Sequence, residues 1–142
     1  MDNLDTKIVA LLQDYGRTSN AGIARQVGVS EGTVRRRLKR LVDEEFIRVV
    51  ALLEPDRMGY LSEALIAVQI DPDKIDAVGS KISRLDEVSW VSVTTGSFDL
   101  FAWAILHSSE ALGIFLRTKV GTIPGVRRTE TFVNLSVKKR GY

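Results

Sequence analysis

The densest cluster of side chains that could carry out recognition chemistry is the basic run Arg35-Arg36-Arg37-Leu38-Lys39-Arg40. Guanidinium groups bind phosphates and the edge of guanine through paired hydrogen bonds, and ammonium groups bind phosphates as point charges. The whole chain of 142 residues has a formal net charge of only +2, so its positive charge is concentrated locally. Such a stripe is typical of a nucleic-acid contact, and a merely solvated helix face is the alternative.

The residue types that catalysis and metal binding need are scarce in this sequence. It has no cysteine, which excludes disulfides, thiolate metal sites and cysteine nucleophiles. His107 is the single histidine, so no site can be built from several imidazoles of one chain, and its place at a strand end indicates a surface residue. The sequence shows no nucleophile paired with a base and no phosphate-binding loop. We therefore predict a protein that is not an enzyme and needs no cofactor or metal.

The composition is that of an ordinary globular protein, with 44% hydrophobic and 27% charged residues. No apolar run reaches the length that crosses a bilayer, and Met1–Asp5 lacks the basic and apolar regions of a signal peptide. We therefore expect a cytoplasmic protein with no membrane contact.

The segments around the basic run predict three short helices. Apolar residues that recur every three to four positions indicate helices over residues 4–15, 21–27 and 31–44. Gly28-Val29-Ser30 is expected to form a tight turn, with its serine capping the third helix. Two helices joined by a glycine-containing turn, the second of them basic, are the pattern of a helix-turn-helix motif that binds double-stranded DNA.

The third helix divides into an apolar side and a basic side. The apolar residues at positions 34, 38 and 41 share one side, which leaves Arg36 facing outward and able to pair with guanine. Basic residues on its flanks are expected to contact phosphates, as are the first backbone amides of the helix. The predicted DNA contacts are Ser30, Glu31, Gly32, Thr33, Arg35, Arg36, Arg37, Lys39 and Arg40.

A strand rich in apolar and β-branched residues is predicted over Phe46–Leu53, where it would form a small wing beside the helices. The segment that follows contains Pro55 and Gly59 and is typical of a linker. We therefore expect a DNA-binding domain over residues 1–53, a linker over residues 54–61 and a second domain over residues 62–142.

The second domain alternates strands and helices. Strands are expected over residues 64–70, 88–95, 98–107 and 126–137. Helices that begin at Asp71-Pro72-Asp73 and at Ser108-Ser109 follow the first and third strands. This βαββαβ order predicts a ferredoxin-like fold, so the fold class of the whole chain is α+β.

The third of these strands has apolar residues on both faces, from Leu100 to Leu106. Helices cover only one face of a ferredoxin-like sheet, and the other would expose an apolar patch too large for a typical monomer. We infer that the second face meets an identical sheet in a homodimer.

In its motifs the chain resembles the Lrp/AsnC family of transcription regulators, also called feast/famine regulatory proteins. The N-terminal segments that carry the resemblance are Leu4–Val9, Gly16–Asn20, Ile23-Ala24, Val27–Ser30, Thr33–Arg37 and Leu41–Ile47. The C-terminal segments are Gly96-Ser97-Phe98-Asp99 and Thr129-Glu130-Thr131. The resemblance implies a winged helix-turn-helix joined to a ferredoxin-like domain. It also implies dimers, often assembled into tetramers or octamers, and an amino acid or related metabolite as effector near subunit contacts.

Two departures from the family pattern stand out. Glu45 occupies the turn after the basic helix, where the family often has glycine, so a different helix end is expected. The family's effector motif is commonly Gly-Asp-Tyr-Asp, whereas this chain has Gly96, Ser97, Phe98 and Asp99. The changes remove a carboxylate and a hydroxyl, which favours a less polar effector or none.

Several side chains have two interpretations at this stage. Gly96-Ser97 forms a turn alone or also contacts an effector, and Asp99 binds a ligand amine or caps the turn. We assign Trp90 and Trp103 to the core or the dimer contact rather than to ligand stacking. Two other basic segments are expected to be solvated, or to assist an oligomer contact or DNA wrapping. They are Arg127-Arg128 and Lys138-Lys139-Arg140.

Two other functional classes compete with a DNA-binding regulator. Siroheme decarboxylases share this two-domain layout, but the chain has no second histidine and no basic pocket for a tetrapyrrole. A sensor that has lost DNA binding is the other candidate, and the intact basic stripe argues against it.

Overall fold

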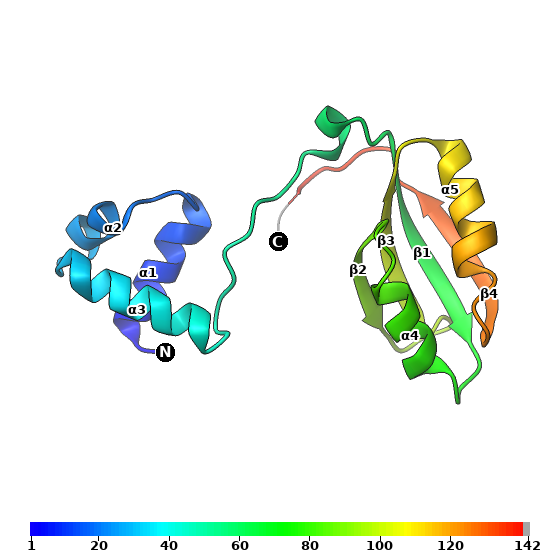
Figure 1. The fold of residues 1–142 in the computed structure, drawn as a ribbon, viewed down its shortest axis with the longest axis horizontal. Helices are drawn as coiled ribbons and strands as arrows, with labels where there is room; N and C mark the ends of the chain where they lie inside the picture. Colours follow the sequence, from blue (N-terminus) through cyan, green and yellow to red (C-terminus); the bar gives the residue numbers. More distant parts are fainter. Residues whose placement is uncertain (141–142) are drawn as a thin grey trace. The chain divides into compact units, whose positions relative to one another are not determined.

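Three helices account for the N-terminal part of the chain in the structure, a computed structural model that describes residues 1–140 (Figure 1). They are α1 (Asn3–Asp14), α2 (Asn20–Val27) and α3 (Glu31–Asp43). The chain divides into two units after Leu52, and each unit has its own core.

Side-chain caps define where these helices begin. Asp2 and Asp5 form a reciprocal capping box on α1, each carboxylate accepting the other residue's backbone N–H at 2.9 Å. Ser19 caps α2 and Ser30 caps α3. Gly28 ends α2 at φ +74°, a left-handed conformation that glycine adopts at little cost. The short α2–α3 turn follows from these residues, as the sequence predicted.

The core of this unit is small and comes from all three helices. Its fully buried members are Ile8, Ile23, Val34 and Leu41, with Ala24 nearly so. Because Val34 and Leu41 are on the inner side of α3, the opposite side of that helix faces solvent. This fixes the orientation of the basic run.

Helix α3 ends in a Schellman motif formed without glycine. The N–H of Phe46 donates to the carbonyl of Leu41 at 2.9 Å, and the N–H of Glu45 donates to that of Val42 at 3.0 Å. Glu45 is left-handed, with φ +59°. The expected difference in helix ending was therefore wrong, because Glu45 adopts the left-handed conformation that a glycine would supply at this position.

The wing strand predicted over Phe46–Leu53 is not formed. Residues 47–53 have no regular secondary structure, and Val49, Val50, Leu52 and Leu53 are exposed. A strand requires a neighbouring strand to satisfy its backbone groups, and the described residues of this chain supply none here. The apolar and β-branched composition therefore did not predict sheet pairing correctly.

The second unit has the strand order of a ferredoxin-like fold. Its elements are the 3-10 helix η1 (Pro55–Met58), β1 (Ser62–Ile70), α4 (Ile75–Ser83), β2 (Val88–Val93), β3 (Leu100–Leu106), α5 (Ser109–Phe115), the π-helical η2 (Leu116–Val120) and β4 (Val126–Val133). The sheet order is β2-β3-β1-β4, with every pair antiparallel (Figure 1). This confirms the predicted βαββαβ topology.

Alternate residues of the two central strands point into the core that α4 and α5 cover. On β1 these are Ala64, Ile66, Val68 and Ile70, and they pack with Val78, Ile82, Leu112 and Phe115 of the helices. Antiparallel partners share a face, so Leu65 and its neighbours Trp103 and Phe132 lie on the opposite face. The sheet therefore has one face covered by helices and one that its own helices leave open.

Two boundaries in the second unit differ from those predicted by more than two residues. Helix α4 begins at Ile75 with no side-chain cap, because Asp71–Asp73 form a turn in which the Lys74 N–H donates to the Asp71 carbonyl at 2.8 Å. Strand β4 ends at Val133 rather than at residue 137, and Leu135 is 98% exposed. Among the described residues, none forms a helix with the length and apolar character that crossing a membrane requires.

The left-handed Glu45 leads to a stability prediction. Glu45→Gly should stabilise the N-terminal unit by about 1 kcal/mol, because a side chain at positive φ is strained and glycine is not. Hydrogen exchange of the slowest α3 amides in the full chain would measure the change. Glu45→Ala is the control, since it removes the charge and keeps the Cβ. An equal gain in both variants would contradict the strain argument.

Candidate nucleic-acid interface

The solvent side of α3 is formed by the residues that the sequence predicted to face DNA. Gly32, Arg35, Arg36 and Lys39 are exposed, whereas Val34 on the opposite side is fully buried. At the start of the helix, the Ser30 hydroxyl accepts the Thr33 N–H at 3.2 Å and lies 2.8 Å from the Thr33 hydroxyl. The cap therefore fixes the first turn of the helix beside its exposed face.

The basic residues of this face differ in how strongly they are already paired. Arg35 contacts Glu31 at 3.0 Å and Lys39 contacts Asp43 at 2.5 Å, both one helical turn away and both exposed. Exposed pairs of this kind contribute only about 0.3–0.5 kcal/mol and are easily exchanged for a phosphate. Arg36 forms no ion pair with any residue in the part of the chain that the structure describes. It is the guanidinium on this face that is most available to a base.

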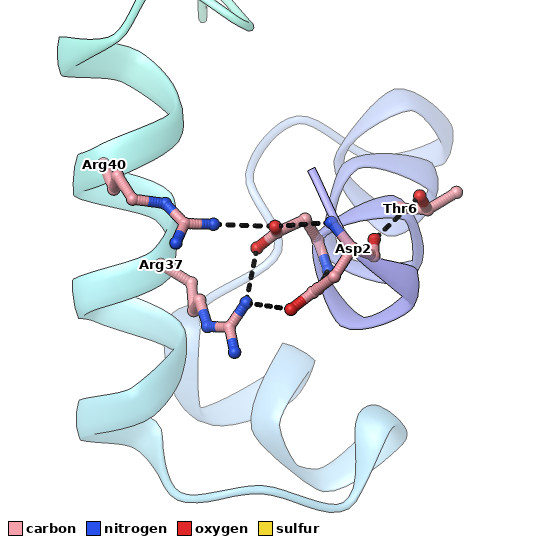
Figure 2. Close-up of polar contacts among 5 residues, drawn as sticks. Asp2, Thr6, Arg37 and Arg40 are labelled. Atoms are coloured by element: carbon pink, nitrogen blue, oxygen red, sulfur yellow. Dashed lines mark hydrogen bonds and ion pairs between the residues drawn. The ribbon is translucent and has the colours of Figure 1, made fainter.

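Two arginines of the run point to α1 instead (Figure 2). Arg37 Nη1 lies 2.5 Å from Asp2 Oδ2 and 3.3 Å from Asp5 Oδ1, and Arg40 Nη2 lies 2.7 Å from Asp5 Oδ2. The sequence predicts DNA contacts at both positions, and in the structure both guanidinium groups are paired with carboxylates of the α1 N-terminus. The helical positions of Arg37 and Arg40 are on the side that borders the N-terminus of α1, where two carboxylates attract them.

Asp5 is the reason for this arrangement. Its side chain is 0% exposed and accepts from both guanidinium groups and from the Asp2 N–H. A buried carboxylate is strongly destabilising unless it is paired and hydrogen-bonded, so both arginines are needed close to it. Sequence reasoning missed Asp5, although its spacing from Asp2 is that of a capping box and gave a usable signal.

Asp2 shows the electrostatic effect of the cluster. Its pKa is lowered from 3.8 to about 2, first by the hydrogen bond from the Asp5 backbone N–H and then by the hydrogen bond and charge of Arg37. The same contact raises the pKa of Arg37. Both groups are therefore ionised at neutral pH, where their charges attract each other.

The turn that the sequence singled out as a candidate effector site lies between β2 and β3. Asp99 Oδ2 accepts the Ile70 N–H at 2.7 Å, and the Asp99 N–H donates to the Val68 carbonyl at 2.9 Å. One carboxylate oxygen of Asp99 therefore holds the end of β1, a contact different from the local turn cap that was expected. Gly96 has φ +112°, a conformation that favours glycine.

Phe98 has a different environment from the polar motif that it replaces. Its ring meets Phe101 edge to face, with 6.2 Å between centroids, and the Arg128 guanidinium lies 5.5 Å above it. The Ser97 carbonyl is 3.5 Å from Gln69 Nε2. The four residues of the motif thus form one end of the sheet face that the helices do not cover.

That open face is rich in aromatic and aliphatic side chains. Trp90 pairs with Trp103 across β2 and β3, and Leu65 has Trp103 on one side and Phe132 on the other. Trp90 and Phe132 are 51% and 48% exposed. Trp103 donates its Nε1–H to the buried Glu63 carboxylate at 3.2 Å. Both tryptophans thus lie on the sheet face and not in the core beneath the helices.

Each of the two units matches a family of known proteins. Residues 1–42 match the family profile of the AsnC-type helix-turn-helix domain, and residues 63–142 match that of the Lrp/AsnC ligand binding domain. The chain is 41% identical over 143 residues to an uncharacterized HTH-type transcriptional regulator of Pyrococcus furiosus, covering 100% of this chain and 97% of that protein.

Solved structures extend the likeness to the fold. Escherichia coli AsnC has a TM-score of 0.89 at 28% identity, covering 100% of this chain and 97% of that one. The regulator NMB0573 of Neisseria meningitidis, solved as a complex with L-Met, has a TM-score of 0.90 at 26% identity, covering 99% and 94%.

These features define a DNA-binding transcription regulator with an N-terminal helix-turn-helix and a C-terminal ferredoxin-like domain. Within that class, the chain belongs to the Lrp/AsnC family.

The Asp2–Arg37 contact gives a pH prediction. Because the folded pKa of Asp2 is below its ordinary value, its contribution to stability is complete above pH 3.8 and is lost as pH falls through about 2. Carbon-detected NMR titration should find Asp2 near 2 in the wild type. In Arg37→Met the pKa should rise but stay below 3.8, because the Asp5 backbone hydrogen bond remains. Arg35→Met is the control and should leave it unchanged, and titration of Asp2 at 3.8 in the wild type would refute the contact.

Proposed function

We propose that the chain acts as a homodimeric regulator whose two α3 helices enter major grooves on one side of a DNA duplex. Half-sites would then lie about one helical turn, or a multiple of it, apart. The observation that carries this proposal is the exposed α3 face, in which Arg36 is unpaired among the described residues and the N-terminal turn is capped by Ser30.

The residues divide by role. Arg36 reads a base, with guanine favoured because its O6 and N7 accept a bidentate guanidinium. Arg35 and Lys39 contact phosphates after releasing Glu31 and Asp43, and Gly32 and Thr33 allow close approach to the groove. The backbone amides at Ser30 and Glu31 hold a phosphate at the helix N-terminus. Arg37 and Arg40 orient α3 through Asp5 and are left out of the primary contact.

The open sheet face supports the dimer. Trp90, Trp103, Phe101, Leu65 and Phe132 would be buried against the same residues of a second chain about a two-fold axis. Assembly into tetramers or octamers would build on this unit. Since regulation by binding alone accounts for the site, we propose no catalytic activity and no cofactor.

We further propose that an amino acid or related metabolite modulates the regulator at subunit contacts near Gly96–Asp99. Support comes from the Neisseria regulator, whose structure holds L-Met. With Ser97 and Phe98 in place of the family's polar pair, this turn favours a less polar effector. An effector shifts DNA affinity only by as much as it binds one assembly better than another.

The DNA-reading role of Arg36 can be tested by selecting random duplex DNA with the purified protein. The wild type should recover a pseudo-palindrome. Arg36→Ala should lose roughly 1–3 kcal/mol of discrimination at one base pair in each half-site. It should weaken non-specific binding much less. Arg84→Ala, an exposed arginine of the second unit, is the matched control. Full sequence preference in Arg36→Ala would show that α3 faces the groove differently.

The dimer face can be tested with Phe132→Glu. A charge placed in the apolar contact should weaken dimerisation by about a hundredfold or more, because it would be buried without a partner. Analytical ultracentrifugation over a dilution series measures this. Ile114→Glu is the control, because Ile114 is 54% exposed on α5 and lies on the helix side of the sheet. Equal dissociation by both variants, or by neither, would rule out the open sheet face as the dimer contact.

A further inference from the structure

A surface pocket lies at the end of the β2–β3 hairpin that is opposite the Gly96–Asp99 turn. It has a volume of about 420 Å³, within the range of small-molecule sites in proteins. The end of β3, the helix α5 and the segment before β2 form its walls. It belongs entirely to the second unit, and its lining includes none of the five residues named for the proposed dimer face and none of Gly96–Asp99.

The walls of this pocket are mainly apolar. Ile105 and Leu106 come from β3, and Ala111, Ile114 and Phe115 come from α5. Ile114 is 54% exposed, although its side chain is large and aliphatic. A bound apolar group would cover it and remove that surface from water.

Glu87 provides an acceptor that is not fully used. Its Oε1 is paired with the Lys119 ammonium, and its Oε2 is buried with no hydrogen-bond partner among the described residues. Burial acts to raise the pKa of Glu87, but the hydrogen bond from Lys119, a hydrogen bond from the backbone of Glu87 and the charge of Lys119 together outweigh it, so the pKa lies below its ordinary value. A buried acceptor without a donor is destabilising, and a hydrogen bond from a ligand N–H would relieve this cost.

The charges in the pocket favour a cation over an anion. Asp86 and Glu87 contribute two carboxylates, and Lys119 contributes one ammonium. Because Lys119 already neutralises one oxygen of Glu87, the remaining charge is negative. An incoming ammonium group would meet attraction from both carboxylates.

An irregular helix positions the polar side of the site. Residues Leu116–Val120 form a π-helix, a rare conformation that is frequent at functional sites. In it, the Thr118 hydroxyl donates to the Ile114 carbonyl at 2.7 Å, and Lys119 reaches Glu87. The wider turn thus brings Thr118 and Lys119 to the same pocket.

Two stacked rings complete the rim. Tyr60 and His107 lie 4.4 Å apart between centroids, with 16° between their planes. A His107 ring nitrogen is 3.2 Å from the Gly59 carbonyl, and the Leu61 N–H donates to the His107 carbonyl at 3.4 Å. A ligand that contacts these rings would also contact the segment that leads into β1.

We propose that this pocket binds a small primary amine with an apolar body. The ammonium donates to Glu87 Oε2, and the apolar body packs on Ile114 and Phe115 beneath the Tyr60–His107 stack. A free aliphatic amine and a hydrophobic amino acid share this chemistry. They differ only in a carboxylate, for which Lys119 is the available partner.

Titration calorimetry of the full chain without DNA tests the site, using isoamylamine, leucine and isovalerate as probes. Isoamylamine should bind and isovalerate, which has no ammonium, should not. Glu87→Gln should weaken isoamylamine binding by about tenfold or more, because a charged hydrogen bond is lost. Glu110→Gln removes the same charge from the exposed first turn of α5 and should have no effect. Equal binding of isovalerate, or unchanged binding in Glu87→Gln, would overturn the proposal.

The variant Lys119→Met distinguishes the two candidate ligands, a free aliphatic amine and a hydrophobic amino acid. Isoamylamine should bind at least as tightly as to the wild type, since Glu87 then has no competing cation. A selective loss of leucine binding would identify an amino acid as the ligand, and loss of isoamylamine binding would contradict the role of Glu87. Ile114→Ala, a surface change that leaves the fold intact, should weaken both. None of these titrations contains DNA, so their results are independent of the proposed DNA contact.

Discussion

The buried carboxylate of Asp5 is the constraint on which the DNA-binding unit depends. It has no contact with water and is held by Arg37 and Arg40, while its own oxygen completes the capping box with Asp2 (Figure 2). Because a buried charge must be paired, the register of α3 against α1 is restricted to one in which both guanidinium groups reach it. The hydrophobic core of this unit is small, so the ion cluster specifies an orientation that packing alone would fix less firmly.

This constraint divides one basic run into two functional sets. Arg37 and Arg40 are used internally, and Arg35, Arg36 and Lys39 remain for DNA on the other side. The sheet of the second unit is divided in the same way between two roles. One face packs against α4 and α5, and the other presents Trp90, Trp103 and Phe132 for assembly. Each end of the β2–β3 hairpin then carries a candidate ligand site, and the one at Gly96–Asp99 adjoins the proposed assembly face.

Much of this could be predicted from the sequence because local signals were consistent. The serine caps, Gly28 and the periodicity of Val34, Leu38 and Leu41 fixed the helices, and alternating strands and helices gave the sheet topology. The sequence-based predictions missed features of the structure that depend on contacts between residues distant in sequence. Periodicity does not show that Arg37 and Arg40 pair with Asp5, which is about thirty residues away, and Phe46–Leu53 was predicted as a strand although the described residues supply no neighbouring strand. Glu87 and the pocket around it were not visible at all, since they depend on a π-helical turn.

The division of the arginines is tested most directly by the salt dependence of binding to non-specific duplex DNA. Each phosphate contact contributes about 0.9 to the slope of log K against log salt. Arg35→Met should therefore reduce the slope by about 0.9 per protomer, whereas Arg37→Met should leave the slope unchanged and lower only the stability of the N-terminal unit. Equal reductions of the slope in both variants would show that Arg37 releases Asp5 to bind DNA, and would contradict the account.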